Sequence, residues 1–493
     1  MDREKRVLAF DFGASGGRAI LGTFNGKTIY LKEVHRFSND PVFVQGTLYW
    51  DVLRLFHEIK QGLVKAKLLG RIDSIGVDTW GVDFGLLDPA GRLLENPVHY
   101  RDQRTAGMLE EAFRKLDPKE FYDRTGNQFM EINTAFQLLS LAEHRPELLE
   151  RAQTMLLMPD LFNYLLCGSK KTEYSIGSTT QLLEAKERCW STKVIQSLGI
   201  PQHIFTEIIP PGTPLGPVSS ELAEELGLAE RPTVIAVAGH DTQCAMAAVP
   251  SRSEDFIFLS CGTWSLLGTE LSAPLISEKS SQYNITNEGA YGGRASFLKN
   301  IIGLWLIQES RRQWIREGRE YSFSVLEEMA RAATPLQSFI DPDAPEFVPA
   351  GNIPERIREY CRRTGQAVPE NEGAIVRCID ESLALKYRHV LTQIEDCTAR
   401  EYSSNIHMVG GGTQSSLLCQ LTANACQRRV KAGPVEATVM GNIVLQLLAA
   451  GELKNLQEAR QVIADSEVIS VFTPKQPEVW SDAYQKWKDL VLC

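Results

Sequence analysis

Residues suited to binding a phosphate stand near the start of the chain, in the segment Asp11-Phe-Gly-Ala-Ser-Gly-Gly-Arg18. Its glycines permit a tight turn whose backbone N–H groups can converge on an anion. Ser15 adds a hydroxyl donor, and Arg18 adds a planar, permanent positive charge that suits phosphate oxygens. Asp11, at the end of a predicted strand, could hold a hydrated Mg²⁺. Taken alone, the segment fits a phosphate-binding turn and a ligand-free hairpin equally well.

A candidate general base lies in the segment Gly239-His-Asp-Thr242, between a predicted buried strand and a predicted helix. A carboxylate at the end of such a strand could accept a proton from a substrate hydroxyl. Asp241 and Thr242 also occupy positions typical of a helix N-cap. The local pattern by itself favours the cap, and His240 alone is more typical of a structural histidine.

Three further segments could bind polar ligands. The segment Asp78-Thr-Trp-Gly-Val-Asp-Phe84 could form a polyol-binding edge, although a β-bulge with incidental Asp residues explains it more simply. Residues 260–265 form a second turn with hydroxyl groups, and residues 409–414 contain three consecutive glycines that could lie against a base or ribose, or form a plain loop. Cys261 is expected to be a buried packing residue and not a nucleophile, because no base is placed beside it.

The first half of the chain must position these residues with strands and helices. Strands are expected at 6–12, 19–24 and 28–34, with a hairpin signal at Asn25-Gly26. A helix is expected at 51–69, with Leu53, Phe56, Ile59 and Leu63 on one face. Strands at 72–78 and 82–87 follow, and residues 104–230 are expected to be mostly helical.

The same kind of pattern then starts again. Strands are expected at 233–237, 256–259, 264–269, 406–409 and 429–432. Helices are expected from 241 to 248 and at 298–316, 373–395, 415–426 and 436–448. This doubling predicts two related α/β domains facing a cleft, over residues 1–244 and 245–493.

Composition narrows the classes of function. The 493 residues are 43% hydrophobic and 23% charged, which is typical of a globular protein. The net charge of −10 argues against a nucleic-acid partner, and no apolar run approaches the ~18 residues of a membrane helix. The ten cysteines contain no C-x-x-C, so we expect free thiols, Cys361 and Cys378 included. A cytoplasmic protein that binds small molecules, with no membrane or nucleic-acid partner, is therefore expected.

The joint order of these motifs resembles the actin-like ATPase fold and, within it, the FGGY family of carbohydrate kinases. Segments 284–289, 298–305 and 433–437 share the resemblance, which extends from about residue 6 to 450. It implies an α/β protein with two actin-like (ribonuclease H-like) ATPase domains. Their mixed sheets would be flanked by helices and would face a central cleft. The first domain would hold the sugar and the first phosphate turn, and the second would bind the nucleotide.

The resemblance also implies roles for individual residues. Asp241 would be the proton acceptor, and the sugar would contact Gly81, His240, Asp241, Thr242 and Asn300. ATP would contact the first turn and the second half, at Ala14, Ser15, Gly16, Gly17, Arg18, Thr263, Gln308 and Gly411. Mg²⁺, held through Asp11, would accompany ATP, and the phosphoryl acceptor would be O1 of a ketose. Two departures from the wider family, Ala14 and the segment 239–242, favour L-rhamnulose.

Two alternatives remain open. The substrate could be another ketose, L-fuculose or a similar six-carbon deoxy sugar. A choice between a methyl and a hydroxymethyl group on the ring is worth only ~1–3 kcal/mol in an apolar pocket, which residue spacing cannot settle. The protein could also belong to a different class, as an actin/Hsp70-like ATPase or a sugar-sensing pseudokinase. Asp241 and residues 79–84 argue against this class, because a nucleotide-driven assembly protein has no evident need for them. The oligomeric state, monomer or homodimer, the anomer and nucleotide preferences and the role of residues 320–370 are left open.

Overall fold

The computed structural model describes residues 4–253, 255–402 and 405–491 and divides into two compact units. The first unit comprises Met1–Arg252, Leu271–Phe297 and Ala437–Ser466, and the second comprises Ser253–Glu270, Leu298–Glu436 and Glu467–Cys493. Two segments of the second half of the chain thus pack with the first unit. The domain limits 1–244 and 245–493 remain a prediction, which assigns both segments to the second half.

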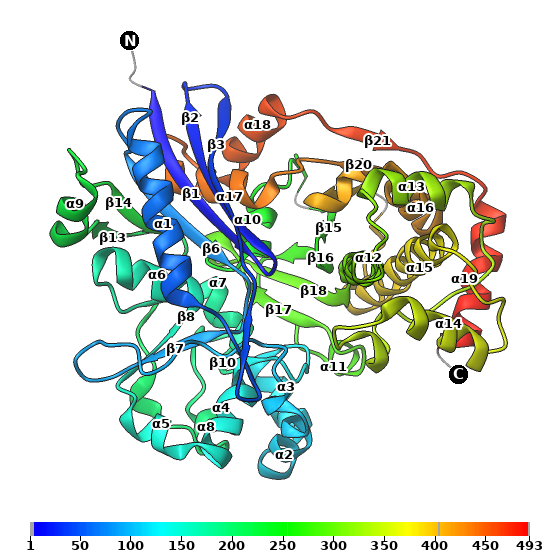
Figure 1. Ribbon diagram of the computed structural model, residues 1–493, viewed down its shortest axis with the longest axis horizontal. Coiled ribbons are helices and arrows are strands. Elements are labelled where there is room, and N and C mark those ends of the chain that lie inside the picture. The colour runs from blue at the N-terminus through cyan, green and yellow to red at the C-terminus, as the bar shows by residue number, and fades with distance from the viewer. Residues whose placement is uncertain (1–3, 254, 403–404, 492–493) are drawn as a thin grey trace. The chain divides into compact units, whose positions relative to one another are not determined.

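The first unit is built on a six-stranded sheet in the order β13-β14-β6-β1-β2-β3 (Figure 1). Its strands are β1 (Lys5–Gly13), β2 (Gly16–Phe24), β3 (Ile29–Ser38), β6 (Ser74–Thr79), β13 (Thr213–Pro217) and β14 (Thr233–Ala236). β1, β2 and β3 pair antiparallel in succession, while β6 runs parallel to both β1 and β14. The sheet is therefore mixed, and the predicted hairpins at its start are confirmed.

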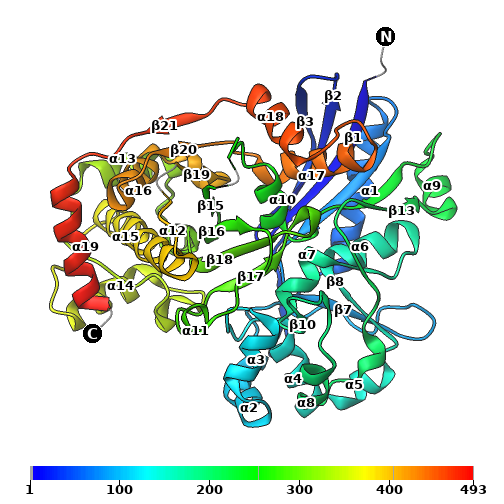
Figure 2. The ribbon, with the colours of Figure 1, turned by 180° about the vertical axis from the view of Figure 1, so that it is seen from behind.

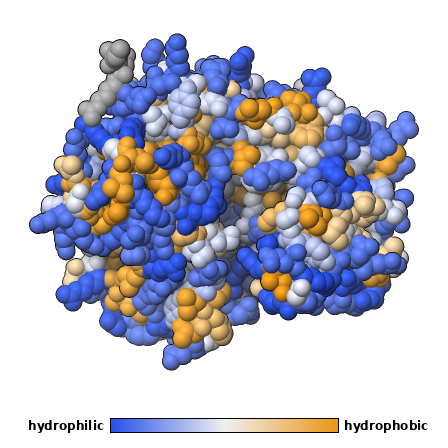
Figure 3. Space-filling model, turned by 45° about the horizontal axis from the view of Figure 1, so that its top comes forward, coloured by the Kyte–Doolittle hydropathy of each residue, from blue (hydrophilic) through white to orange (hydrophobic). Residues whose placement is uncertain are grey.

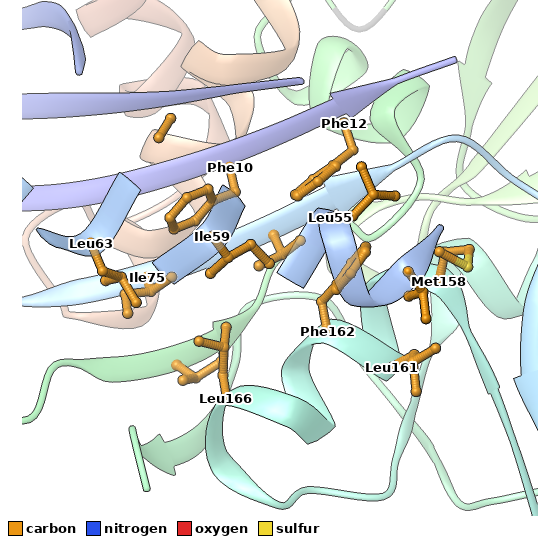
Figure 4. Packing of buried hydrophobic residues seen from close by; sticks show 14 of the residues in the cluster. Phe10, Phe12, Leu55, Ile59, Leu63, Ile75, Met158, Leu161, Phe162 and Leu166 are labelled. Carbon is orange, nitrogen blue, oxygen red and sulfur yellow. The ribbon is translucent and has the colours of Figure 1, made fainter. Parts of the chain in front are cut away.

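The helices α1 (Val52–Lys67) and α6 (Met158–Cys167) cover one face of this sheet. Figure 4 shows Phe10 and Phe12 of β1 pointing toward Ile59 of α1 and Phe162 of α6. The rings of Phe12 and Phe162 stack with centroids 4.8 Å apart. This apolar layer fixes β1, whose carboxyl end carries Asp11.

The apolar face expected on α1 includes one residue that is not buried. Leu53 is 66% exposed, whereas Val52, Leu55 and Ile59 form the buried stripe. Asp51 caps the helix by accepting a hydrogen bond from the Arg54 N–H, so the buried face begins at the first helical residue.

The opposite face of the sheet is covered by α10 (Asp241–Ala247) and α17 (Ala437–Ala449). The amide of Asn442 donates to the Gly76 carbonyl at 3.2 Å, and that of Gln446 donates to the Leu8 carbonyl at 3.2 Å. A Cβ at Gly441 would lie 1.7 Å from the Cys244 carbonyl oxygen, so only glycine allows α10 and α17 to approach this closely. The helix predicted at 436–448 therefore belongs to the first unit.

Residues 104–230 of the first unit are mainly helical, as predicted. Besides α6, the α-helices are α2 (Met108–Lys115), α3 (Pro118–Thr125), α4 (Thr134–His144), α5 (Pro146–Arg151), α7 (Tyr174–Gly177), α8 (Thr192–Ser197) and α9 (Ser220–Leu226). A separate two-stranded ribbon joins β7 (Phe84–Leu87) to β8 (Thr154–Leu157). Two short segments, β9 (Thr172–Glu173) and β17 (Thr286–Gly289), carry buried glutamates.

In the second unit, strands follow one another in the order β16-β15-β19-β20-β21. They are β15 (Ile257–Cys261), β16 (Trp264–Leu271), β19 (Ile406–Val409), β20 (Val430–Ala432) and β21 (Ser470–Phe472). β15 pairs antiparallel with β16 and parallel with β19, just as β1 pairs antiparallel with β2 and parallel with β6. The predicted doubling of an α/β pattern is therefore confirmed.

The main helices of the second unit are α12 (Trp305–Arg316), α13 (Phe323–Ala332), α14 (Ile353–Arg363), α15 (Glu372–Thr398), α16 (Ser416–Cys426) and α19 (Pro477–Val491). Figure 2 shows α12, α15 and α16 from behind. The predicted helix 298–316 is wrong in its first part, because β18 (Ala295–Ile302) extends to Ile302. Apolar residues there fit a helical spacing, but the β-branched pair Ile301-Ile302 favours a strand. Asn300 consequently lies on a strand.

The face of the molecule shown in Figure 3 is mixed in polarity. In the part of the chain that the structure describes, no helix is long and apolar enough to cross a membrane. On the face shown in Figure 3, apolar residues form separate patches among hydrophilic ones. Cys361 and Cys378 are free thiols, and Cys493 lies outside the described residues.

Candidate functional site

The turn between β1 and β2 is the tight hairpin that the glycines predict, with Gly13 opposite Gly16. Asn39 braces it, because its side-chain amide donates to the Gly13 carbonyl at 2.9 Å and its backbone N–H donates to the Ser15 carbonyl at 3.3 Å. A Cβ at Gly17 would lie 2.3 Å from the ring of Phe37. Ala14 and Ser15 therefore form the tip of a turn whose two sides are fixed.

Two carboxylates stand side by side where β1 and β6 end. Asp11 lies opposite Asp78 in the parallel register, and Arg18 donates to Asp11 Oδ2 at 2.6 Å. Asp78 is fully buried, and its Oδ2 accepts a hydrogen bond from Asn442 at 2.6 Å. Burial, together with the neighbouring Asp11 carboxylate, raises the pKa of Asp78 well above its ordinary value. Asp78 therefore keeps its proton to higher pH than an ordinary Asp does.

Asp241 is the first residue of α10, and His240 occupies the N-cap position. The predicted cap at Asp241 is therefore wrong, and its carboxylate is left available. The side chain is 31% accessible and accepts a hydrogen bond from the Thr242 hydroxyl at 3.1 Å. Burial raises its pKa, the His240 ring opposes this, and Asp11 adds to it. Asp241 is thus a partly buried carboxylate that still reaches solvent and has a raised pKa, two properties that suit a general base.

Two buried glutamates that the sequence reasoning did not single out hold the turn before Asp241. Glu173 accepts hydrogen bonds from the Gly239 N–H at 2.8 Å and from the Ser175 hydroxyl at 2.5 Å. Glu288 pairs with His240 Nδ1 at 2.9 Å. Glu288 lies in the family-like segment 284–289, which was the only signal pointing to it, whereas nothing in the sequence pointed to Glu173.

The segment before β7 forms a strained turn at Gly81. The Asp83 N–H donates to the Gly81 carbonyl at 2.9 Å, and Val82 between them has φ 68°. A β-branched residue rarely adopts this left-handed conformation, so the strand predicted from residue 82 begins only at Phe84. A Cβ at Gly81 would lie 3.3 Å from the Thr179 side chain, which is the nearest neighbour at this position.

Asp83 does not contribute a free carboxylate to the polyol-binding edge that segment 78–84 could form. It is 1% exposed, and its Oδ2 accepts hydrogen bonds from the indoles of Trp50 at 2.6 Å and Trp80 at 2.9 Å. Its Oδ1 accepts from Gln137 at 2.9 Å. Burial raises the pKa of Asp83 to about 6 against these hydrogen bonds. Asp83 is therefore an internal clamp on the turn that carries Gly81.

The carboxylates fit a hydrated Mg²⁺. Mg²⁺ is usually bound through one or two carboxylates, several waters and phosphate oxygens. Asp11 keeps 10% of its side chain accessible, and the buried Oδ1 of Asp78 has no hydrogen-bond donor among the described residues. No group of three or more His, Cys, Asp or Glu residues in the described ranges could enclose a metal. An ion beside Asp11 would therefore need water and phosphate oxygens to complete its shell.

The residues Thr263, Gln308 and Gly411, for which the sequence predicts contacts with a nucleotide, lie in the second unit. The hydroxyl of Thr263 donates to Gln308 Oε1 at 3.3 Å, and its carbonyl accepts from the Trp305 N–H at 3.1 Å. A Cβ at Gly412 would lie 2.2 Å from Cys261 Sγ, whereas one at Gly411 would meet no described heavy atom within 4 Å. Burial raises the pKa of Cys261 to about 11, so the group stays a neutral thiol that packs in the interior, as expected.

The candidate residues thus form a group in each unit. Gly81, His240, Thr242 and the carboxylates are in the first unit together with the turn 14–18. Asn300 is in the second unit, with Thr263, Gln308 and Gly411.

Comparison with known proteins matches both halves of the chain. A model of the FGGY family of carbohydrate kinases, N-terminal domain, matches residues 6–248, and that of the C-terminal domain matches residues 257–450. A rhamnulokinase of Bacteroides thetaiotaomicron is 41% identical over 99% of this chain and 100% of its own length. A rhamnulokinase of Halalkalibacterium halodurans is 43% identical over 93% of this chain and 97% of its own.

Solved structures of lower identity share the fold. A ligand-bound xylulose kinase from Lactobacillus acidophilus has a TM-score of 0.80 at 17% identity, covering 98% of this chain and 97% of its own. Plasmodium falciparum glycerol kinase with ADP has a TM-score of 0.78 at 16% identity, covering 99% and 97%.

Proposed function

The chain belongs to the FGGY family of carbohydrate kinases, and we propose that it transfers the γ-phosphoryl group of ATP to O1 of L-rhamnulose. The products would be L-rhamnulose 1-phosphate and ADP, and the reaction would serve L-rhamnose catabolism. The observation that carries this proposal is the identity of 41% and 43% to curated rhamnulokinases over nearly the whole chain. Because ATP is supplied in the cytoplasm, we place the reaction there.

Asp241 would accept the proton of the attacking hydroxyl. Its carboxylate is 31% accessible, at the start of a helix and next to the carboxyl ends of the sheet. The raised pKa makes its carboxylate a stronger base than that of an ordinary Asp. Phosphoryl transfer passes through a loose transition state, so Asp241 acts chiefly by orienting the hydroxyl in line with the phosphorus.

The turn at 14–18 would receive the phosphate groups of ATP. Its backbone N–H groups and the Arg18 guanidinium, which Asp11 orients at 2.6 Å, would share the developing negative charge. Asp11 would hold Mg²⁺ through water, and the bound ion would neutralise charge on the phosphate oxygens. Thr263, Gln308 and Gly411 would contact the nucleotide, and the open space beside Gly411 leaves room for a flat group.

The sugar would contact Gly81, His240, Thr242 and Asn300. Gly81 is held by the clamped turn described above, and His240 and Thr242 flank the base. Each of these contacts is part of the proposal, and each can be tested by substitution.

Initial rates of ADP formation with Mg-ATP and a panel of ketoses test the proposal. The panel contains L-rhamnulose, L-fuculose and a control without sugar. We expect L-rhamnulose to give the highest kcat/KM. A preference for another ketose would leave the role of Asp241 in place and would contradict the assignment of L-rhamnulose as the substrate. ADP formation at the same rate with and without sugar would contradict the proposal that the protein is a sugar kinase.

A further inference from the structure

A buried carboxylate on β17 reaches the residue next to the proposed base. Glu288 is 5% exposed, and its Oε2 is 2.9 Å from His240 Nδ1 and accepts a hydrogen bond from Gln243 Nε2 at 2.9 Å. Gln243 in turn accepts a hydrogen bond from the Ser296 hydroxyl at 2.7 Å. All four residues lie in the first unit, so the network is internal to it. The phosphoryl transfer proposed for Asp241 does not by itself require Glu288.

The backbone and the ring of His240 are held by different partners. The His240 N–H donates to the Ser175 hydroxyl at 3.3 Å, and Glu173 holds both Ser175 and the preceding Gly239. The ring is held by Glu288 through Nδ1. Removing the Glu288 carboxylate would therefore release the ring while leaving the backbone turn anchored.

The hydrogen bond at Nδ1 determines where the other ring nitrogen lies. His240 Nε2 is 3.5 Å from Asp241 Oδ1, beyond the range of a normal N–H···O hydrogen bond. A substrate bound at Asp241 would therefore have the ring nitrogen Nε2 beside the base. The two groups together can contact two neighbouring oxygens of one sugar.

The ring is also surrounded by acidic groups. Burial disfavours the charged imidazole, but Glu288 on β17, followed by Asp241 on α10 and Glu173 on β9, outweighs it and raises the pKa of His240 to about 9. Both ring nitrogens then carry hydrogen at neutral pH, so Nε2 is a donor and not an acceptor.

We propose that Glu288 is a positioning residue for the sugar. It fixes the His240 ring so that the Nε2–H group donates to the ketose oxygen on the carbon next to the reacting hydroxyl. This inference rests on the proposed function. It assigns Glu288 an effect on ketose binding that a purely structural carboxylate would not have.

The test is Glu288→Gln in the full chain, with L-rhamnulose and ATP varied separately. The variant keeps the size of the side chain and an acceptor oxygen but removes the charge. We expect the KM for the ketose to rise about 10- to 100-fold, as for a lost hydrogen bond to a charged group. The kcat should fall much less, the KM for ATP should be unchanged, and the alkaline limb of kcat/KM should move to lower pH.

Glu58→Gln is a matched control within the first unit. Glu58 is 8% exposed and pairs with His35 Nε2 at 2.6 Å, so it resembles Glu288 in burial and in its histidine partner. Neither Glu58 nor His35 is one of the candidate site residues. We expect its KM values and pH profile to equal those of the wild type.

Histidine NMR on the intact protein keeps the test independent of the stability of the variant. In the wild type, the His240 resonance, assigned with His240→Gln, should titrate near pH 9. A wild-type His240 that titrates near its ordinary value would overturn the inference. If the wild type phosphorylates a ketose, a folded Glu288→Gln variant would also overturn the inference by showing the same KM for the ketose and the same alkaline limb of kcat/KM as the wild type. A wild type that phosphorylates no ketose would instead overturn the proposed function, and this inference with it.

Discussion

The two groups of site residues are built from different chemical groups. In the first unit, Asp11 and Asp78 lie near the ends of buried strands and Asp241 is the first residue of α10, and burial raises the pKa of the last two. In the second unit, the hydroxyl of Thr263, the amide of Gln308 and bare backbone at Gly411 take their place. Carboxylates as a class can accept a proton or bind a cation, whereas a hydroxyl, an amide and bare backbone offer shape and neutral hydrogen bonds. Changes of charge should therefore matter most in the first unit and changes of shape in the second.

The largest effect is expected from Asp241→Asn. The amide keeps the shape of the side chain but cannot accept the proton, so kcat should fall about 10²- to 10⁴-fold. ATP affinity, measured by calorimetry, should stay close to that of the wild type. Asp123→Asn, on the exposed surface of α3, is the matched control and should retain full turnover. Near-normal turnover in Asp241→Asn would show that Asp241 is not the base.

A change of shape in the second unit should affect stability and ATP affinity. In Gly412→Ala the new methyl group would meet Cys261 Sγ at 2.2 Å, so overpacking should cost about 1–3 kcal/mol of unfolding free energy. In Gly411→Ala the methyl group has open space, so stability should be unchanged while the KM for ATP rises. Denaturant unfolding and ATP kinetics separate the two effects. Equal stability of the two variants would contradict the packing described for Gly412.

The charge network of the first unit should make stability depend on pH. The folded pKa of His240 is about 9, above its ordinary value of 6.5, because the acidic neighbours outweigh burial. A group whose folded pKa is raised stabilises the protein below the unfolded pKa and loses that contribution as pH rises through the folded pKa. Between pH 6.5 and 9 the wild type should lose up to about 3 kcal/mol through this group.

Glu288→Gln isolates this term, because it removes the first of the stabilising charges. The difference in unfolding free energy between wild type and variant should be largest below pH 6.5 and should shrink toward pH 9. Urea unfolding at intervals of pH measures it. A difference that is constant over this range would show that His240 does not titrate as described.

The smallest effect is expected at the strained turn. In Val82→Gly, relief of the left-handed backbone should largely offset the lost burial of the side chain, leaving a change within about 1 kcal/mol. Val77→Gly, fully buried on β6, has no such relief and should cost roughly 3 kcal/mol or more. Thermal unfolding compares the two variants, and similar losses in both would argue against strain at Val82.

Local patterns predicted most of the fold. Asn25-Gly26 indicated the hairpin between β2 and β3, and the glycines at 13–17 indicated the turn that the structure contains. The strand β18 was mistaken for helix because its apolar residues fit both spacings, and the pairing that decides between them is not local.

Contacts within the site were less accessible to sequence reasoning. Asn442 bonds to Asp78 across 364 positions of the chain, and His240 bonds to Glu288 across 48. No spacing rule joins such pairs, so Asp241 could be identified as a carboxylate at a strand end, but not its supporting residues. Asp83 shows the converse, since its residue type suggested sugar binding while its burial against Trp50 and Trp80 gives it an internal role.

The most direct test of the account is to identify the product of the wild-type protein with Mg-ATP and L-rhamnulose by ³¹P and ¹H NMR. We predict equal amounts of ADP and a sugar monophosphate whose phosphorus couples to the two protons on C1. A phosphate on any other carbon, or ADP accompanied only by inorganic phosphate, would contradict the account.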